Sequence, residues 1–151
     1  EPLVIACQEM GAEKVGALII IKQADDLNVV VESGIRLDAK LSTSLLENIF
    51  FKNAPLHDGG VVISGDRIVA AKCVLPSTQQ EVPKSYGMRH RAALGMSEVS
   101  DAIIIAVSEE TGRISLAHDS VIKRNIDPQN LAQAIRKLMR QNDRRRENKT
   151  E

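Results

Sequence analysis

The chain has 151 residues, of which 43% are hydrophobic, and this length and composition suit one compact domain with a sizeable core. Its 20 basic and 20 acidic side chains give a formal net charge of zero, which argues against binding to nucleic acid through overall charge. The two cysteines lack the spacing of a zinc site or a disulfide scaffold and fit a reducing, cytoplasmic environment, and no apolar run approaches the roughly twenty residues of a membrane helix.

The first third of the chain predicts two helices and two strands. Apolar residues recur with rough helical spacing over residues 3–14, which predicts a short helix. The uninterrupted, β-branched run at residues 15–21 is typical of a central strand that is covered on both faces. Residues 29–31 predict a short strand, and the hydroxyl-bearing residues 42–44 predict the N-cap of a second helix that continues through Phe50.

A hairpin, a loop, a helix and a strand are predicted next. Residues 61–75 contain two apolar runs around the turn Ser64-Gly65-Asp66, which is the pattern of a β-hairpin. The polar, proline-containing residues 76–87 predict a surface loop. Residues 89–96 have the composition of a helix, and residues 102–107 predict another buried strand.

The last third predicts a final strand, a helix and a tail. Residues 114–117 predict the final strand, and Asp127 with the proline after it marks the start of a helix that ends near Asn142. The charged and polar residues 143–151 predict a disordered tail, so residues 1–142 make up the predicted domain. Together the segments predict an α/β or α+β fold, with one mixed sheet of about five or six strands flanked by helices.

The segment His57-Asp58-Gly59-Gly60 places an acid and two glycines immediately before an apolar strand. Glycine lets the backbone approach a ligand closely, and the carboxylate beside it can hold a divalent cation or accept a proton from a hydroxyl. An ordinary Asp-Gly turn gives the same dipeptide, and the segment taken alone favours that turn.

The segment Gly87-Met88-Arg89-His90-Arg91 places basic residues at the start of a predicted helix. Helix N-termini carry unpaired N–H groups and partial positive charge, so two arginines there indicate a bound anion such as phosphate. A solvated basic face is the alternative, and a single histidine such as His90 is more often structural than a ligand.

The segment Ser108-Glu109-Glu110-Thr111-Gly112 places adjacent carboxylates where a buried strand ends. They can bind a metal ion, although a turn of this composition is also ordinary. The sequence has no Walker loop and no G-x-G-x-x-G, so the common nucleotide-binding signatures are missing. The residues alone therefore predict a phosphate and metal site at strand ends.

The order of these motifs resembles the diadenylate cyclase domain family over nearly the whole chain. Residues 53–60 are similar to the segment with that family's D-G-A motif, residues 89–95 to its R-H-R motif, and residues 108–112 to its S-E-E segment. Residues 16–19 resemble the family's first core strand, and Leu75-Pro76 its loop entry after the hairpin. The run R-H-R-A-A-L-G at this distance from H-D-G is highly specific for the family.

The resemblance implies a catalytic domain that binds one ATP with Mg²⁺ or Mn²⁺ and condenses it with the ATP of a second, facing copy. The product would be cyclic di-AMP, with release of two pyrophosphates. The implied partners are ATP and a second copy of the chain through the active-site face, with no nucleic acid. Some family members carry amino-terminal membrane helices, so we expect a cytoplasmic domain whose parent protein is attached to the inner face of the cell membrane.

The resemblance also implies roles for individual residues. Asp58, together with Gly59, would contact the ribose 3′-hydroxyl or its metal and promote attack on the α-phosphorus of the opposing ATP. Arg89 and Arg91 would hold phosphates, and His90 would contact a phosphate or the metal.

The remaining implied residues bind the metal and the nucleotide. The metal ligands are expected among Asp58, His90, Glu109 and Glu110. The nucleotide is expected to contact Gly60, Val74, Leu75, Met88 and Ser108, with Val74 and Leu75 near the adenine. Two positions depart from the family pattern: Gly60 stands in place of the usual alanine, and Met88 stands where threonine is frequent and offers no hydroxyl to phosphate or ribose.

Two other functions remain open at this point. If Gly60 and Met88 disable the chemistry, the domain is a catalytically weak nucleotide sensor of the same fold, which binds ATP without turnover. The basic run Arg144-Arg145-Arg146 could bind nucleic acid or an anionic membrane, although a solubilising charged tail is the simpler interpretation.

Overall fold

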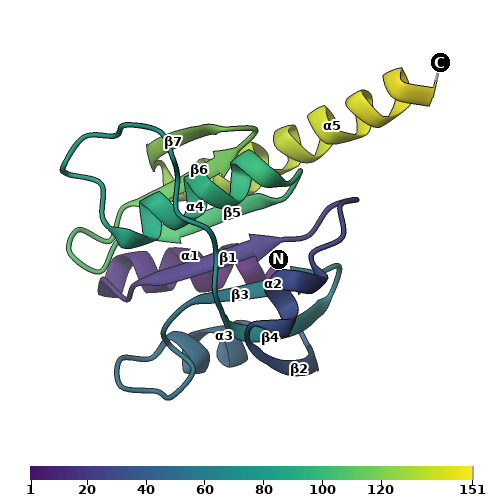
Figure 1. Ribbon diagram of the computed structural model, residues 1–151. Helices are drawn as coiled ribbons and strands as arrows, with labels where there is room; N and C mark the ends of the chain where they lie inside the picture. The colour runs from purple at the N-terminus through teal and green to yellow at the C-terminus, as the bar shows by residue number, and fades with distance from the viewer. Residues whose placement is uncertain (151) are drawn as a thin grey trace.

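The computed structural model describes residues 1–150, with side chains through residue 148, and shows a sheet between two layers of helices (Figure 1). The helices are α1 (Pro2–Glu13), α2 (Asn28–Glu32), α3 (Thr43–Phe50), α4 (Met88–Val99) and α5 (Leu131–Thr150), with a 3₁₀ turn, η1 (Pro128–Asn130), before the last. The strands are β1 (Ala17–Ile21), β2 (Ile35–Lys40), β3 (Gly60–Ser64), β4 (Arg67–Cys73), β5 (Ile103–Val107), β6 (Ile114–His118) and β7 (Val121–Ile126). None of the helices within residues 1–150 combines the length and apolar character that crossing a bilayer requires.

All seven strands form one mixed sheet in the order β2-β4-β3-β1-β5-β6-β7. The central strands β1 and β3 are parallel, and every other neighbouring pair is antiparallel. The α/β class is confirmed, but the sheet has more strands than predicted, because β2 and β7 were missed. Both lie at the sheet edges with mostly exposed side chains, so they lack the apolar runs that predicted the inner strands.

The segment predicted as a strand at residues 29–31 is helical instead. It forms α2, a single turn in which Val31 is buried and Val29 is 85% exposed. The valines favour a strand by propensity, but Asp26 Oδ1 accepts a hydrogen bond from the Asn28 N–H at 2.7 Å and turns the chain. This local hydrogen bond and the burial of one side of the turn outweigh the weak intrinsic preference.

The other predicted helices and strands are confirmed with small shifts at their ends, except that the C-terminal helix ends well beyond its predicted end. Ser42 caps α3, because its hydroxyl accepts a hydrogen bond from the Leu45 N–H at 3.1 Å. Asp127 Oδ1 accepts from the Gln129 N–H at 2.9 Å and caps the 3₁₀ turn before α5. Both caps lie where side-chain oxygens precede an apolar run in the sequence.

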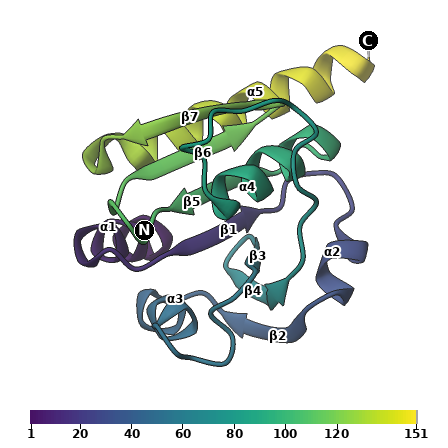
Figure 2. The same cartoon turned by 60° about the vertical axis from the view of Figure 1, so that its left-hand side comes forward.

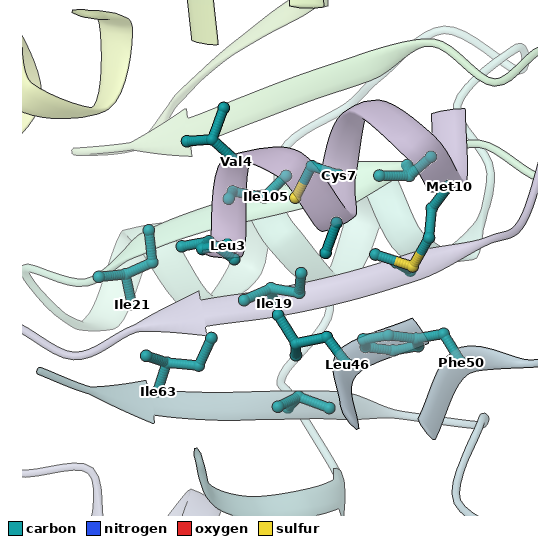
Figure 3. Close-up of a cluster of buried hydrophobic side chains, with 14 of the residues drawn as sticks. Leu3, Val4, Cys7, Met10, Ile19, Ile21, Leu46, Phe50, Ile63 and Ile105 are labelled. Atoms are coloured by element: carbon teal, nitrogen blue, oxygen red, sulfur yellow. The ribbon is translucent and has the colours of Figure 1, made fainter. Parts of the chain in front are cut away.

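Two apolar clusters hold the helices on the two faces of the sheet (Figures 1 and 2). Helices α1 and α3 and the first turns of α5 cover one face, and α2 and α4 cover the other. Figure 3 shows side chains of α1 and α3 packed against the central strands, among them Leu3, Cys7, Met10, Leu46, Phe50, Ile19, Ile63 and Ile105. Strands β1 and β5 are buried along their whole length, which explains their uninterrupted apolar sequences.

The C-terminal helix is longer than the sequence predicted. We expected a helix end near Asn142 and disorder over residues 143–151, whereas α5 continues through Thr150 and extends beyond the rest of the domain (Figure 1). Residue 151 lies outside the described residues. Arginines of the added turns form ion pairs with aspartates: Arg145 with Asp119, and Arg146 with Asp101 and Asp143. Composition alone does not reveal such pairs, because two of them join residues far apart in the chain.

Asn142 anchors this helix through buried hydrogen bonds. Its side chain is 3% exposed, its Oδ1 lies 2.7 Å from His118 Nε2, and its Nδ2 donates to the Asp101 carbonyl at 2.9 Å. The substitution Asn142→Ala would leave the buried His118 without this partner, so we expect it to lower the free energy of unfolding by about 1–3 kcal/mol. Chemical denaturation measures the change, with Gln133→Ala on the exposed side of α5 as the control. A loss no larger than that of the control would contradict the anchoring role.

Candidate active site

Strand register brings the three polar motifs to one end of the strands, which is called this edge of the sheet from here on. The parallel strands β1 and β3 both begin at this edge, and Ala17 at the start of β1 pairs with Val107 at the end of β5. Gly60 at the start of β3 pairs with Cys73 at the end of β4. The segments that flank these residues therefore meet at the same edge: Gly16, Asp58-Gly59, Val74-Leu75 and Ser108-Glu109-Glu110.

The start of α4 reaches this edge through Arg89. A methyl group on Gly16 would lie 2.5 Å from Arg89 Cζ, so the glycine leaves the space that the guanidinium occupies. Arg89 Nη1 lies 3.7 Å from Glu109 Oε1, with the arginine side chain 27% exposed and the glutamate 66% exposed. An ion pair of this length and exposure is weak, so both groups are available to a ligand.

Asp58 lies at the end of the loop before β3, with its side chain 76% exposed. His57 stands beside it, with Nδ1 2.7 Å from the Ala54 carbonyl oxygen and Nε2 3.2 Å from Asp58 Oδ1. Gly59 has a φ of +82°, and a Cβ atom there would lie 2.7 Å from the Cys73 carbonyl oxygen, so the backbone requires glycine at this position. The contact with His57 orients the Asp58 carboxylate, a role that we did not assign to this histidine from the sequence.

The Ser-Glu-Glu turn is ordered by its own hydrogen bonds. Ser108 Oγ accepts from the N–H groups of Glu110 and Thr111, both at 3.2 Å, which leaves the hydroxyl proton for donation to a ligand. Gly112 packs on the end of α1, where a Cβ atom on Gly112 would lie 2.1 Å from the Gly11 carbonyl oxygen. Helix α1 thus fixes the position of the turn.

His90 and Arg91 make contacts within the local structure. His90 is buried, and its Nδ1 accepts a hydrogen bond from the Gly87 N–H at 3.3 Å. Arg91 Nε donates to the Tyr86 carbonyl at 3.3 Å and ties α4 to the preceding loop. Burial, and then the nearby Arg124 guanidinium, lower the pKa of His90. These contacts agree with the structural interpretation of His90 that the sequence left open.

Acidification is expected to destabilise the fold through the hydrogen bond between the Gly87 N–H and His90 Nδ1. The pKa of His90 in the folded state is lower than its ordinary value of 6.5, so the unfolded chain binds the proton more readily. The free energy of unfolding therefore falls as the pH drops from about 6.5 through the lowered pKa of the folded state. Thermal unfolding between about pH 7.5 and 5 measures the effect. We expect wild type to lose more stability over this range than His90→Asn, whose amide oxygen can accept the same N–H bond without titrating. Equal losses of stability in the two proteins would contradict the structural role of neutral His90 as the acceptor of this hydrogen bond.

The residues expected at the nucleotide differ in their exposure. Val74 is 69% exposed and Met88 87% exposed, so both present apolar side chains to solvent at this edge. Gly60 is buried, and a methyl group there would lie 2.6 Å from Ile20 Cδ1 and 2.9 Å from Leu75 Cδ1. The flexible ends of these side chains occupy the space that the methyl group of the family's usual alanine would take. Gly60 is therefore shielded from direct ligand contact, whereas Val74 and Met88 are open to it.

The carboxylates at this edge fit the oxygen preference of Mg²⁺ or Mn²⁺, but one chain does not bring the predicted ligands together. Within residues 1–150, no group of three or more histidine, cysteine or acidic side chains is placed to hold a metal ion. The predicted set Asp58, His90, Glu109 and Glu110 therefore does not form one site here. The exposed Glu109 and Glu110 have the chemistry to share a cation with the phosphate oxygens of a bound nucleotide.

A cavity of about 590 Å³ opens beside the start of α4. Its walls come from residues 84–87, the first turn of α4, the Ser-Glu-Glu turn, β6 and β7. Four cationic side chains line it: Lys84, Arg89, Arg113 and Arg124. Only Arg89 belongs to a motif that the sequence revealed, because the other three are scattered along the chain without a recognisable spacing. Asp58 and Leu75 lie outside these walls.

Comparison with known proteins identifies the family. The family model described as DAC, DisA bacterial checkpoint controller nucleotide-binding, matches residues 4–122. The chain belongs to this DAC family. The resemblance to a diadenylate cyclase domain, which rested on the D-G-G, R-H-R and S-E-E segments, is thereby confirmed.

Individual relatives of this DAC domain agree in sequence and structure. Cyclic di-AMP synthase CdaS of Bacillus subtilis (strain 168) is 46% identical over 123 residues, which cover 82% of this chain and 59% of that protein. The crystal structure of a double mutant of DacA from Staphylococcus aureus superposes with a TM-score of 0.88 at 40% identity and covers 91% of this chain and 92% of that chain. A Bacillus cereus structure described as a hypothetical membrane spanning protein gives a TM-score of 0.80 at 43% identity, over 83% of this chain and 62% of that chain. The chain spans about half the length of the curated relatives it matches.

Proposed function

We propose that this DAC domain is a diadenylate cyclase, a nucleotidyltransferase that condenses two ATP into cyclic di-AMP and two pyrophosphates. The observation that carries the proposal is the convergence of Asp58, Arg89 and the Ser-Glu-Glu turn on one sheet edge. The family match and the relative named cyclic di-AMP synthase support the same reaction. These groups suit a nucleotide with a reacting hydroxyl: the carboxylate can accept the hydroxyl proton, the cation can bind phosphate, and the exposed apolar side chains can contact the base.

In the proposed reaction, the 3′-hydroxyl oxygen of each ATP attacks the α-phosphorus of the other. The Asp58 carboxylate accepts the hydroxyl proton as the new P–O bond forms. The bond between the α-phosphorus and the oxygen that bridges to the β-phosphorus breaks, and pyrophosphate leaves with the electron pair. Arg89 stabilises the phosphate charge, and Ser108 donates its hydroxyl proton to a phosphate oxygen. Mg²⁺ or Mn²⁺, which Glu109 and Glu110 would hold, neutralises phosphate charge when bound.

Apolar side chains at the same edge are proposed to receive the adenine. Val74 and Leu75 follow β4 directly, and Val74 is largely exposed. Met88 lies at the start of α4 and is also largely exposed, so it can cover a flat ring but cannot replace the hydroxyl of the family's frequent threonine. Binding of adenine would remove both exposed side chains from water.

The assembly and location of the parent protein are also proposals. We infer a head-to-head homodimer as the working species, because one chain carries a single Asp58 and a single Arg89 for a product with two equivalent links. The Bacillus cereus structure described as that of a hypothetical membrane spanning protein supports membrane association of the parent protein. We further propose that this attachment is at the inner face of the cell membrane, with this domain in the cytoplasm.

Incubation of the purified domain with ATP and Mn²⁺ tests the activity. Mass spectrometry should detect cyclic di-AMP, and a coupled assay should detect two pyrophosphates for each product molecule. Saturable ATP binding without product would support the sensor and contradict the cyclase. Absence of ATP binding under these conditions would contradict both functions.

The substitution Arg89→Ala is expected to raise the ATP concentration needed for half-maximal turnover by roughly tenfold or more, because a lost charge-assisted contact costs about 1.5–3 kcal/mol. Steady-state kinetics measure the change. Arg67→Ala is the matched control, since Arg67 pairs with Asp38 at the opposite edge of the sheet. Unchanged kinetics in Arg89→Ala would return the R-H-R segment to the solvated-face interpretation.

A further inference from the structure

The cavity beside α4 has an excess of positive charge. Its walls hold four cationic side chains but only two carboxylates, Glu109 and Glu110. It also lies at the N-terminus of α4, a helix of 12 residues whose N-cap, Gly87, forms no side-chain cap hydrogen bond. The free N–H groups and the dipole of such a helix start favour an anion. The charge and the helix together fit a ligand with several anionic oxygens.

Ser115 gives an independent indication of a ligand. Its side chain comes from β6, is 1% exposed and lines the cavity. Its Oγ has no hydrogen-bond partner within the part of the chain that the structure describes. Buried hydroxyl groups in folded proteins are nearly always paired, so the free hydroxyl points to a group that completes it. An oxygen of a ligand in the cavity would accept its proton.

Arg124 lies on β7, on another wall of the same cavity. Its Cζ lies 4.6 Å from the centroid of the Tyr86 ring, and its Nη1 donates to Ser85 Oγ at 3.3 Å. These partners are an aromatic face and a hydroxyl rather than a carboxylate, so they position the guanidinium without neutralising it. The Tyr86 ring in turn lies 5.7 Å from the His90 ring. Arg124 stands beyond residues 4–122, which the family model matches.

We infer that Ser115 and Arg124 form a subsite in this cavity that binds the pyrophosphate end of ATP. The inference rests on the proposed function, in which each ATP releases its β- and γ-phosphates as pyrophosphate. Arg89 lies beside Gly16 at the end of the strands and also lines the cavity. A phosphate chain that binds Arg89 would therefore lie where the strand ends meet the cavity. Ser115 donates its hydroxyl proton to a phosphate oxygen, and Arg124 neutralises the charge that the leaving group gains as the P–O bond breaks.

Isothermal titration calorimetry of the whole chain with inorganic pyrophosphate and Mg²⁺ tests the subsite directly. We expect Arg124→Gln to weaken pyrophosphate binding about tenfold and Ser115→Ala roughly fivefold. The matched control is Lys123→Gln, because Lys123 precedes Arg124 on β7 but lines a separate cavity under α5. It removes the same charge from the same strand and should leave the affinity unchanged.

Thermal unfolding separates ligand binding from a structural role of Ser115. Removal of an unpaired buried hydroxyl should leave the melting temperature of the ligand-free Ser115→Ala chain unchanged or higher, although its pyrophosphate affinity falls. A lower melting temperature together with unchanged affinity would show that the hydroxyl is structural and would overturn the inference. Equal affinity of wild type and both variants for pyrophosphate would overturn it as well.

Turnover measurements distinguish a failure of the subsite from a failure of the proposed activity. If wild type makes no cyclic di-AMP but binds pyrophosphate in a manner that depends on Ser115 and Arg124, the subsite stands and the proposed activity fails. If wild type makes cyclic di-AMP but binds no pyrophosphate, or binds it equally well after both substitutions, the subsite fails and the activity stands.

Discussion

Asp58→Asn is expected to reduce cyclic di-AMP formation by about 10²–10⁴-fold while the fold remains intact. Asparagine has nearly the same shape as aspartate but can neither accept the proton of the 3′-hydroxyl nor attract a cation strongly. The side chain is 76% exposed and its Oδ1 lies 3.2 Å from His57 Nε2, so its replacement removes little packing. The loss should therefore appear in the rate and not in stability.

The control for this experiment is Asp66→Asn. Asp66 lies in the turn between β3 and β4, at the opposite edge of the sheet, and is also exposed. Initial rates of cyclic di-AMP formation, circular dichroism and melting temperatures should be compared for wild type and the two variants. Near-normal output from folded Asp58→Asn, at a rate similar to that of the control, would refute the catalytic assignment.

Burial on both faces explains which parts of the fold could be predicted from sequence. Strands β1 and β5 are buried at every position, so each is a continuous run of apolar residues that no loop would carry. The edge strands β2 and β7 are mostly exposed and are held as strands by hydrogen bonds to β4 and β6, with a register shift in each pair. The sequences of β2 and β7 alone do not indicate this pairing.

The same distinction applies to the site. Asp58, Arg89 and Glu109 belong to contiguous motifs, and each motif could be recognised before its position was known. Ser115 and Arg124 are isolated residues, and they meet in one cavity because β6 pairs with β7 beside the end of β5. Ser115 in particular looks like any small residue of a buried strand, and only the absence of a partner within the described residues distinguishes it.

Activity per milligram is expected to rise with protein concentration until dimers saturate. Cyclic di-AMP has two equivalent phosphodiester links, so each ATP is both attacker and target, and a two-fold axis satisfies both roles at once. In-line attack needs the reacting atoms about 3–3.5 Å apart, which two separately diffusing complexes reach only when their active faces dock. In this mechanism the exposed side chains Met88 and Val74, together with the adenine that they would receive, would face the partner chain.

Mixing experiments test the shared site more sharply. A ninefold excess of Asp58→Asn over wild type should lower the activity per wild-type chain by about tenfold if chains pair at random, since a mixed pair lacks one of its two carboxylates. The same excess of Asp66→Asn should not inhibit, because that chain keeps Asp58. Adding Met88→Glu to the inactive Asp58→Asn chain should relieve the inhibition, because a buried, unpaired charge at the docking face prevents pairing. Activity per milligram that stays constant down to concentrations at which the protein is demonstrably monomeric would contradict the head-to-head mechanism, because a single chain would then supply both halves of the reaction.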